Sequence, residues 1–178
     1  MFISLQKKIS QAENRLKEEL GVKNRLALPR ITKVVVNVGT GKIRDKKKNE
    51  LVSDRLGKIT GQRPSPRGAK KSIASFKLRQ GEVVGYAVTL RGARMWSFLD
   101  RLLNVAWPRT RDFKGLADKS IDNLGNFSIG LKENTIFPET ADEDLRDVFG
   151  MTVTIITTAK DKKSALALFH ALNFPFKK

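Results

Sequence analysis

The chain has 178 residues, no cysteine and a formal net charge of +17 at neutral pH. This length and a hydrophobic content of 40% favour one folded domain, residues 1–178, over a disordered chain. The lack of cysteine excludes disulfides, thiolate zinc sites and cysteine nucleophiles. With no apolar run long enough to span a membrane and no secretory apolar segment at the start, we expect a cytoplasmic protein without a membrane partner.

The positive charge is concentrated in the first two-thirds of the chain. Residues 1–115 hold 27 Lys and Arg against 9 Asp and Glu, whereas residues 116–178 are close to neutral. Such an excess disfavours a compact state unless a polyanion neutralises it, so we expect a nucleic-acid partner. A basic, solvated surface is the competing interpretation. A membrane surface is less favoured because no helix pairs a basic face with exposed bulky apolar residues.

In chain order, the first elements are a helix, a strand and a second helix. The first helix ends at Gly21, and a short linker follows as far as Pro29. Residues 31–38 alternate as a strand, with Lys33 and Asn37 opposite the face of Val34, Val36 and Val38. A second helix is predicted over about 46–60, before Gly61. The apolar stripe of the first helix consists of Leu5, Ile9, Ala12, Leu16 and Leu20.

The next stretch, residues 63–81, is strongly basic. It holds two prolines, two glycines and six Lys or Arg without a single acid. We expect a basic mobile loop at about 67–80 that becomes ordered on RNA.

The remaining elements are three strands and two helices. Strands are predicted over 83–91, 126–131 and 151–158, each with one apolar face. A third helix follows Gly92 and stops before Pro108, and a fourth runs from Asp161, its N-cap, towards Pro175. The opposite strand faces carry Gly85, Ala87, Thr89 and Arg91; Asn126, Ser128 and Gly130; and Thr152, Thr154 and Thr158. The acidic run 139–147 is interpreted as a solvated face or as a contact for a basic protein neighbour.

These patterns predict an α+β fold of two layers. Helices would cover one face of an antiparallel sheet and leave the other face open. An open face is often only solvated, but four strands that share small polar residues in so basic a chain favour a binding surface. Small side chains let a polynucleotide approach closely, and Ser, Thr and Asn hydrogen-bond to phosphates and 2′-hydroxyls. Base stacking on the sheet is not expected because the aromatic signature of RNA-recognition motifs is missing.

Catalysis, a metal centre and a cofactor are not expected. His170, the only histidine, has no carboxylate–serine arrangement nearby in the sequence. The turn Gly39–Lys42 lacks the spacing of a phosphate-binding loop, and no set of carboxylates has calcium-loop spacing. Two alternatives stay open: an RNA-modifying or RNA-cleaving enzyme, which measured turnover would reveal, and a non-specific packaging protein, which would show little preference between RNAs.

Eight ordered blocks give a more specific indication. They read LPRITKVVVNVG (28–39), GQRP (61–64), SFKLRQG (75–81), VTLRGARMW (88–96), PRTRDFKGL (108–116), GNFSIG (125–130), IFPE (136–139) and FPFKK (174–178). Together they strongly resemble the bacterial-type large-subunit ribosomal protein L5 family over essentially the whole chain. The resemblance implies a ribosome-bound, two-layer α+β protein of the central protuberance, next to other proteins of that region.

The resemblance also implies an RNA partner and the residues that contact it. The family binds 5S ribosomal RNA and helps to join it to the 23S RNA of the large subunit. The matching positions indicate a 5S-facing set, with core packing as the alternative for Phe76 and a helix-end hydrogen bond as the alternative for Gln62. The ribosomal-RNA-binding residues expected here are Lys33, Asn37, Gln62, Phe76, Thr89, Arg91 and Arg94.

Two further contacts are implied by the family. Its long basic loop approaches transfer RNA in the peptidyl site, and here that loop runs from Arg67 to Arg79, with Lys70, Lys71 and Lys77 also as phosphate partners. The loop reads PRGAKK where the family more usually has bulkier residues before the basic pair. The family also forms a bridge to a protein of the small-subunit head. The candidates for that bridge are Arg109, Arg111, Asp112 and the region 132–147.

Overall fold

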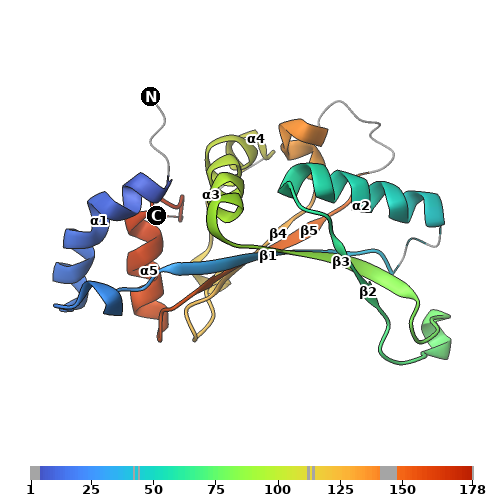
Figure 1. Ribbon diagram of the computed structural model, residues 1–178, viewed down its shortest axis with the longest axis horizontal. Coiled ribbons are helices and arrows are strands. Elements are labelled where there is room, and N and C mark those ends of the chain that lie inside the picture. The colour runs from blue at the N-terminus through green and yellow to red at the C-terminus, as the bar shows by residue number, and fades with distance from the viewer. Residues whose placement is uncertain are drawn as a thin grey trace.

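A five-stranded antiparallel sheet forms the centre of the computed structural model (Figure 1), which describes residues 5–41, 43, 45–111, 113, 115–140 and 148–177. The strand order is β2-β3-β1-β5-β4, and every pair of neighbours runs antiparallel. The predicted α+β class with an antiparallel sheet is thereby confirmed. The strands are β1 (Ile31–Gly39), β2 (Ser65–Gly68), β3 (Val83–Leu90), β4 (Phe127–Leu131) and β5 (Met151–Thr157).

Three of the predicted helices are confirmed, and local signals set their ends. Gly21 and Gly61, which follow the first two helices, have φ values of 63° and 66°, the left-handed region that glycine adopts without strain. At the N-terminus of the last helix, the Asp161 carboxylate accepts a hydrogen bond from the Ser164 N–H at 3.1 Å. Leu5 and Leu16 of the first helix are buried, whereas the side chains of Ile9 and Ala12 lie outside the description. These helices are α1 (Leu5–Leu20), α2 (Lys46–Thr60) and α5 (Lys162–Ala171).

The third helix continues past the point where the sequence predicts its end. After α3 (Gly92–Arg101) the chain makes a π-helical segment, Leu102–Ala106, and continues as α4 (Trp107–Arg109). The N–H of Trp107 donates to the carbonyl of Leu102, five residues back. In a regular α-helix the ring of Pro108 would clash with the carbonyl four residues earlier. The wider π turn offers a way to avoid that clash, so the prediction of a stop before Pro108 is wrong.

The core lies between the sheet and one layer of helices. Figure 1 shows α2 and α3 on the same side of the sheet, with α1 and α5 together at one end. Val34, Val36 and Val38 of β1 are at most 1% exposed and face this layer, as predicted. Phe127 of β4 lies at the centre of an aromatic cluster, with ring centroids 5.5 Å from Phe169 and about 6.1 Å from two further phenylalanines near the C-terminus.

The basic stretch 63–81 contains a strand that the sequence does not predict. β2 pairs with β3 at one edge of the sheet. Beyond it the hairpin continues: the Ala69 N–H donates to the Glu82 carbonyl at 2.8 Å, and Ile73 and Leu78 exchange backbone hydrogen bonds of 3.1 and 3.2 Å. A single 3-10 turn, Ala74–Phe76, lies at the tip. The segment is therefore an extended hairpin attached to the sheet.

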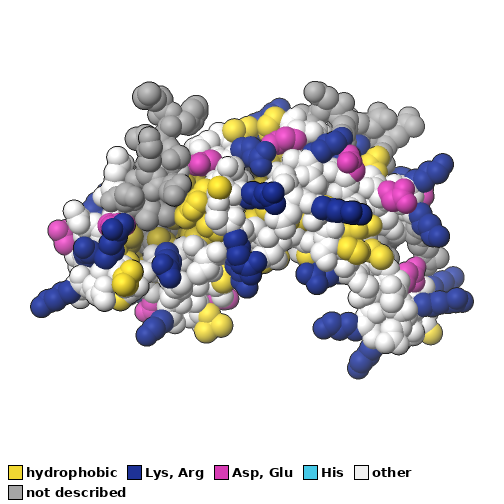
Figure 2. All heavy atoms as spheres, in the orientation of Figure 1, with side chains coloured by type: hydrophobic (Ala, Val, Ile, Leu, Met, Phe, Trp, Pro, Cys, Tyr) yellow, Lys and Arg dark blue, Asp and Glu magenta, His cyan; other side chains and the backbone are white. Residues whose placement is uncertain are grey.

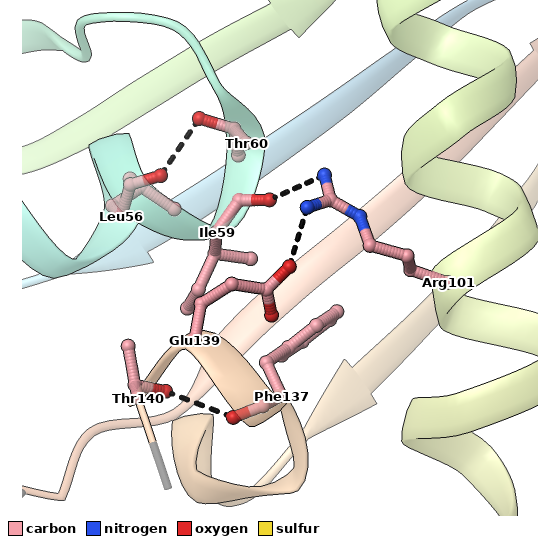
Figure 3. A network of polar contacts seen from close by, with 7 residues as sticks. All are labelled: Leu56, Ile59, Thr60, Arg101, Phe137, Glu139 and Thr140. Carbon is pink, nitrogen blue, oxygen red and sulfur yellow. Dashed lines mark hydrogen bonds and ion pairs between the residues drawn. The ribbon is translucent and has the colours of Figure 1, made fainter. Parts of the chain in front are cut away.

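Arg101 joins three parts of the helical layer (Figure 3). Its guanidinium donates to the carbonyl of Ile59, in the last turn of α2, at 3.0 Å, and forms an ion pair with Glu139. Glu139 belongs to a short 3-10 turn, Pro138–Thr140, where the buried hydroxyl of Thr140 donates to the carbonyl of Asn134 at 2.8 Å. Glu139 is thus tied to the helices, and the interpretation of a solvated face is wrong at this residue.

Candidate nucleic-acid interface

The register of the strands lines up small and polar residues on the sheet face opposite the helices. One row of paired residues crosses all the strands, and every member is small or polar. Asn37, at the centre of the row, is exposed. The row consists of Ser65, Ala87, Asn37, Thr152 and Gly130.

A second row next to the first carries three hydroxyl side chains and one valine. Ser128 and Thr154 are paired across β4 and β5, and their hydroxyl oxygens are 3.1 Å apart, which is a hydrogen bond. Val35 and Thr89 continue this row across β1 and β3, and both are partly exposed. We call the two rows the open face. Its hydroxyls and its single amide are the polar groups that meet an approaching partner.

Gly85 keeps the hairpin end of the sheet close-packed. It pairs with Gly39 on the same side of the sheet as the open face. A Cβ at position 85 would lie 2.6 Å from the carbonyl oxygen of Val38, closer than real Cβ contacts allow. No side chain fits there, which leaves the surface smooth beside Asn37.

Four of the predicted ribosomal-RNA-binding residues, Asn37, Thr89, Lys33 and Gln62, lie on the open side of the sheet or are bonded to it. Lys33 lies on the same side of β1 as Asn37. The side-chain amide of Gln62 donates to the backbone carbonyl of Thr89 at 3.3 Å, so its bond reaches β3 rather than the end of α2. Arg91 is the N-cap residue of α3, Arg94 lies in its first turn, and both are exposed.

Phe76 is separate from this group. Its side chain at the hairpin tip is 67% exposed, which excludes the alternative of core packing. It lines a hollow of about 420 Å³ together with Tyr86 and with Lys46 at the start of α2. Tyr86 pairs with Val38 and therefore points to the helical side of the sheet. Phe76 consequently does not join Asn37 and Thr89 on one surface.

The predicted transfer-RNA-facing residues occupy the hairpin, and all of them are exposed. Space-filling Figure 2 shows Lys and Arg side chains projecting from this end of the molecule. Hydrogen bonds from the Gln80 N–H to the Ser72 hydroxyl at 2.9 Å and from the Arg79 N–H to the Glu82 carboxylate at 3.1 Å hold the tip. The exposed basic residues are Arg67, Lys70, Lys71, Lys77 and Arg79.

The candidates for the bridge are only partly described. Arg109 and Arg111 are exposed and line a hollow of about 720 Å³ that Lys132 and Glu133 also border. Asp112 and residues 141–147 lie outside the described residues, as do Lys42 and Arg44.

Two turns lie at the end of the sheet opposite the hairpin, and each contains an aspartate whose carboxylate accepts hydrogen bonds from its own turn. Asp122 accepts hydrogen bonds from the N–H groups of Leu124 and Asn126, at 3.0 and 2.7 Å. Burial alone would raise the pKa of Asp122, but these donors outweigh it and hold the pKa below its ordinary value. Hydrogen bonds from the Ser164 hydroxyl and N–H likewise lower the pKa of Asp161.

Groups suited to catalysis are not assembled in the described part of the chain. His170 is exposed near the end of α5, with its ring centroid 5.1 Å from that of Phe176. Among the described residues there is no group of three or more His, Asp or Glu that could hold a metal ion. Nor does any described helix combine the length and apolar character needed to cross a membrane.

Comparisons with known proteins match nearly the whole chain. The family model for ribosomal protein L5 matches residues 24–79, and the model for the C-terminus of the ribosomal L5P family matches residues 83–176. The chain is 48% identical over 164 residues to the large ribosomal subunit protein uL5 of Ureaplasma parvum serovar 3, covering 92% of this chain and 89% of the relative. It is 47% identical over 167 residues to uL5 of Natranaerobius thermophilus, covering 93% of each.

Proposed function

The chain belongs to the ribosomal protein L5 family of the large subunit, and we propose that its open face binds 5S ribosomal RNA. Membership makes it a structural, ribosome-bound protein of translation and not an enzyme. The finer proposal concerns which RNA is held and by which surface.

The row that includes Asn37 is the observation that carries this proposal. Side chains as small as those of Ser65, Ala87 and Gly130 let a folded RNA approach the sheet, where hydroxyl and amide groups hydrogen-bond to phosphates, 2′-hydroxyls and base edges. Lys33, on the same side of β1 as Asn37, would displace counterions from the RNA, and the exposed Arg91 and Arg94 at the start of α3 would add to this charge. The direct hydrogen bonds would then fix the position of the RNA on the sheet, while the cations supply affinity.

Phe76 would reach the same RNA from a second position. Because its ring is exposed on the hairpin and not on the sheet, it suits stacking on an unpaired base at the margin of the site. Gln62, held by Thr89, would present its remaining amide atoms beside the open face.

The other contacts in the proposal use the periphery of the domain. The basic hairpin suits phosphates of transfer RNA in the peptidyl site, because its cations are exposed and its tip projects from the sheet. Arg109 and Arg111 are the candidates for a bridge to a small-subunit head protein. Attachment of 5S RNA to 23S RNA, with contacts to neighbouring proteins of the central protuberance, completes the proposed role.

The test uses Asn37→Ala and Thr89→Ala with a labelled 5S transcript at fixed salt. Each variant should keep the parent's circular dichroism spectrum and lose about tenfold or more in affinity, because base and 2′-hydroxyl contacts of this kind contribute about 1–3 kcal/mol each. Asn14→Ala, at an exposed position on α1, is the matched control and should bind like the parent. Unrelated RNA of equal length serves as the competitor. Parent-like binding by both open-face variants would refute the proposal.

A further inference from the structure

The end of the sheet opposite the hairpin is a rigid junction of three segments. The Arg30 N–H donates to the Thr158 hydroxyl at 3.0 Å, and the Thr158 N–H donates back to the Arg30 carbonyl at 2.9 Å. The hydroxyl of Thr157 donates to the carbonyl of Gly125 at 2.8 Å. A Cβ at Gly125 would lie 2.6 Å from the Cβ of Ala159, so the two turns are in direct contact. The segment before β1 and the turns 122–126 and 158–161 therefore form one surface.

Two of the acids at this junction accept hydrogen bonds from groups of their own turns. Asp122 holds the turn 122–126 together, and Asp161 caps α5. Both carboxylates accept hydrogen bonds from groups within their own turn, and their lowered pKa values agree with that use.

Three bases at the junction are exposed. Arg30 and Lys160 lie next to the mutual hydrogen bonds of Arg30 and Thr158, and Lys119 lies near the adjoining edge of β4. Within the described part of the chain none of these three side chains forms an ion pair. The net charge of residues 116–178 is close to zero and gives no sign of Lys119 and Lys160. Five of the nine acids in this part of the chain lie in the segment 139–147.

We propose that Arg30, Lys119 and Lys160 form a second phosphate-binding rim, which holds the far end of the RNA that lies on the open face. This inference rests on the proposed function and extends it. Lys33, on the open face and paired with Ile156, connects the rim to the row that includes Asn37. None of these three rim residues is among the RNA-binding positions predicted from the sequence.

The rim and the basic hairpin lie at opposite ends of the sheet, so that both could hold one RNA. β1 begins directly after Arg30 and ends at Gly39, which pairs with Gly85 where β3 leads into the hairpin. The rim and the hairpin are therefore separated by the length of one strand, about 30 Å. Figure 1 shows the hairpin and the turn that precedes β4 on the same side of the sheet, away from α2 and α3. Figure 2 shows Lys and Arg at both of these ends. An RNA on the open face would thus meet cations at each end.

The experiment measures how the affinity for 5S RNA depends on salt. Each phosphate neutralised contributes about 0.7–0.9 to the slope of log K against log salt, so the double variant Arg30→Gln/Lys160→Gln should reduce the slope by about 1.5. Its affinity should fall tenfold or more at low salt. The matched control is Lys47→Gln/Lys58→Gln on α2, which removes the same charge from the helical layer and should keep the parent's slope.

A second measurement needs no variant. Lys160 should be protected from acylation when the parent protein binds 5S RNA, whereas Lys47 should react equally in both states. If the parent binds 5S RNA but the rim variant matches the control in slope, or Lys160 reacts equally with and without RNA, the rim is refuted and the open face stands. If the parent does not bind 5S RNA, the proposed function and the rim fall together.

Discussion

The two faces of β1 have opposite properties although their residues alternate along one strand. Val36 is fully buried against the helical layer, while its neighbour Asn37 is exposed at the centre of the open face. One face therefore serves the core and the other is free to contact a partner. Stability and RNA affinity should therefore respond to different substitutions, even where the positions are adjacent in sequence.

The largest expected effect is on the helical side. Phe127→Ala should lower the free energy of unfolding by about 3–5 kcal/mol, because a fully buried ring in contact with Phe169 is lost and a cavity is left. Urea denaturation followed by circular dichroism measures the loss. Protein that remains folded should bind 5S RNA like the parent, and a reduced affinity of the folded fraction would break the division between the faces.

An intermediate effect on stability is expected at Gly85, although this residue lies on the open side of the sheet. Gly85→Ala should destabilise the protein by about 1–3 kcal/mol although position 85 belongs to the open side, because its Cβ would press on the carbonyl of Val38. Gly130→Ala makes the same change on the open face with nothing within 4 Å and should be close to neutral. Equal midpoints of urea denaturation for the two variants would contradict the packing argument.

The smallest effect concerns the exposed hydroxyl pair. Ser128→Ala removes its hydrogen bond with Thr154 and should cost only about 0.5 kcal/mol, since the pair is open to water. A double-mutant cycle with Thr154→Ala would isolate the coupling between the two hydroxyls. A coupling above about 1.5 kcal/mol would mean that the open face contributes to stability as the core does. That result would contradict the division of roles between the two faces of the sheet.

Most of the architecture could be predicted because local signals and burial agree. Gly21, Gly61 and Asp161 mark helix ends by backbone geometry and capping, and the alternation around Val36 separates the two faces of β1. β2 could not be predicted, since Pro66 and Gly68 are typical of turns and only pairing with β3 makes the segment a strand.

The candidate site is harder to predict, because residues that are far apart in the sequence can lie side by side on the folded surface. The alternation pattern placed Asn37 and Thr89 on one surface, whereas Phe76 lies apart from them on the hairpin. The bases Arg30 and Lys160 give no joint signal in the sequence, because they belong to segments that lie far apart along the chain. Only the mutual hydrogen bonds of Arg30 and Thr158 bring these segments together.

The short edge strand β2 has a consequence for the protein before it meets RNA. An outer strand normally offers a row of free amide and carbonyl groups on which a second chain can add a strand of its own. β2 has only four residues, its Pro66 has no amide hydrogen to offer, and Arg67 adds a charge. A newly made copy should therefore resist pairing with a strand of a second chain along this edge.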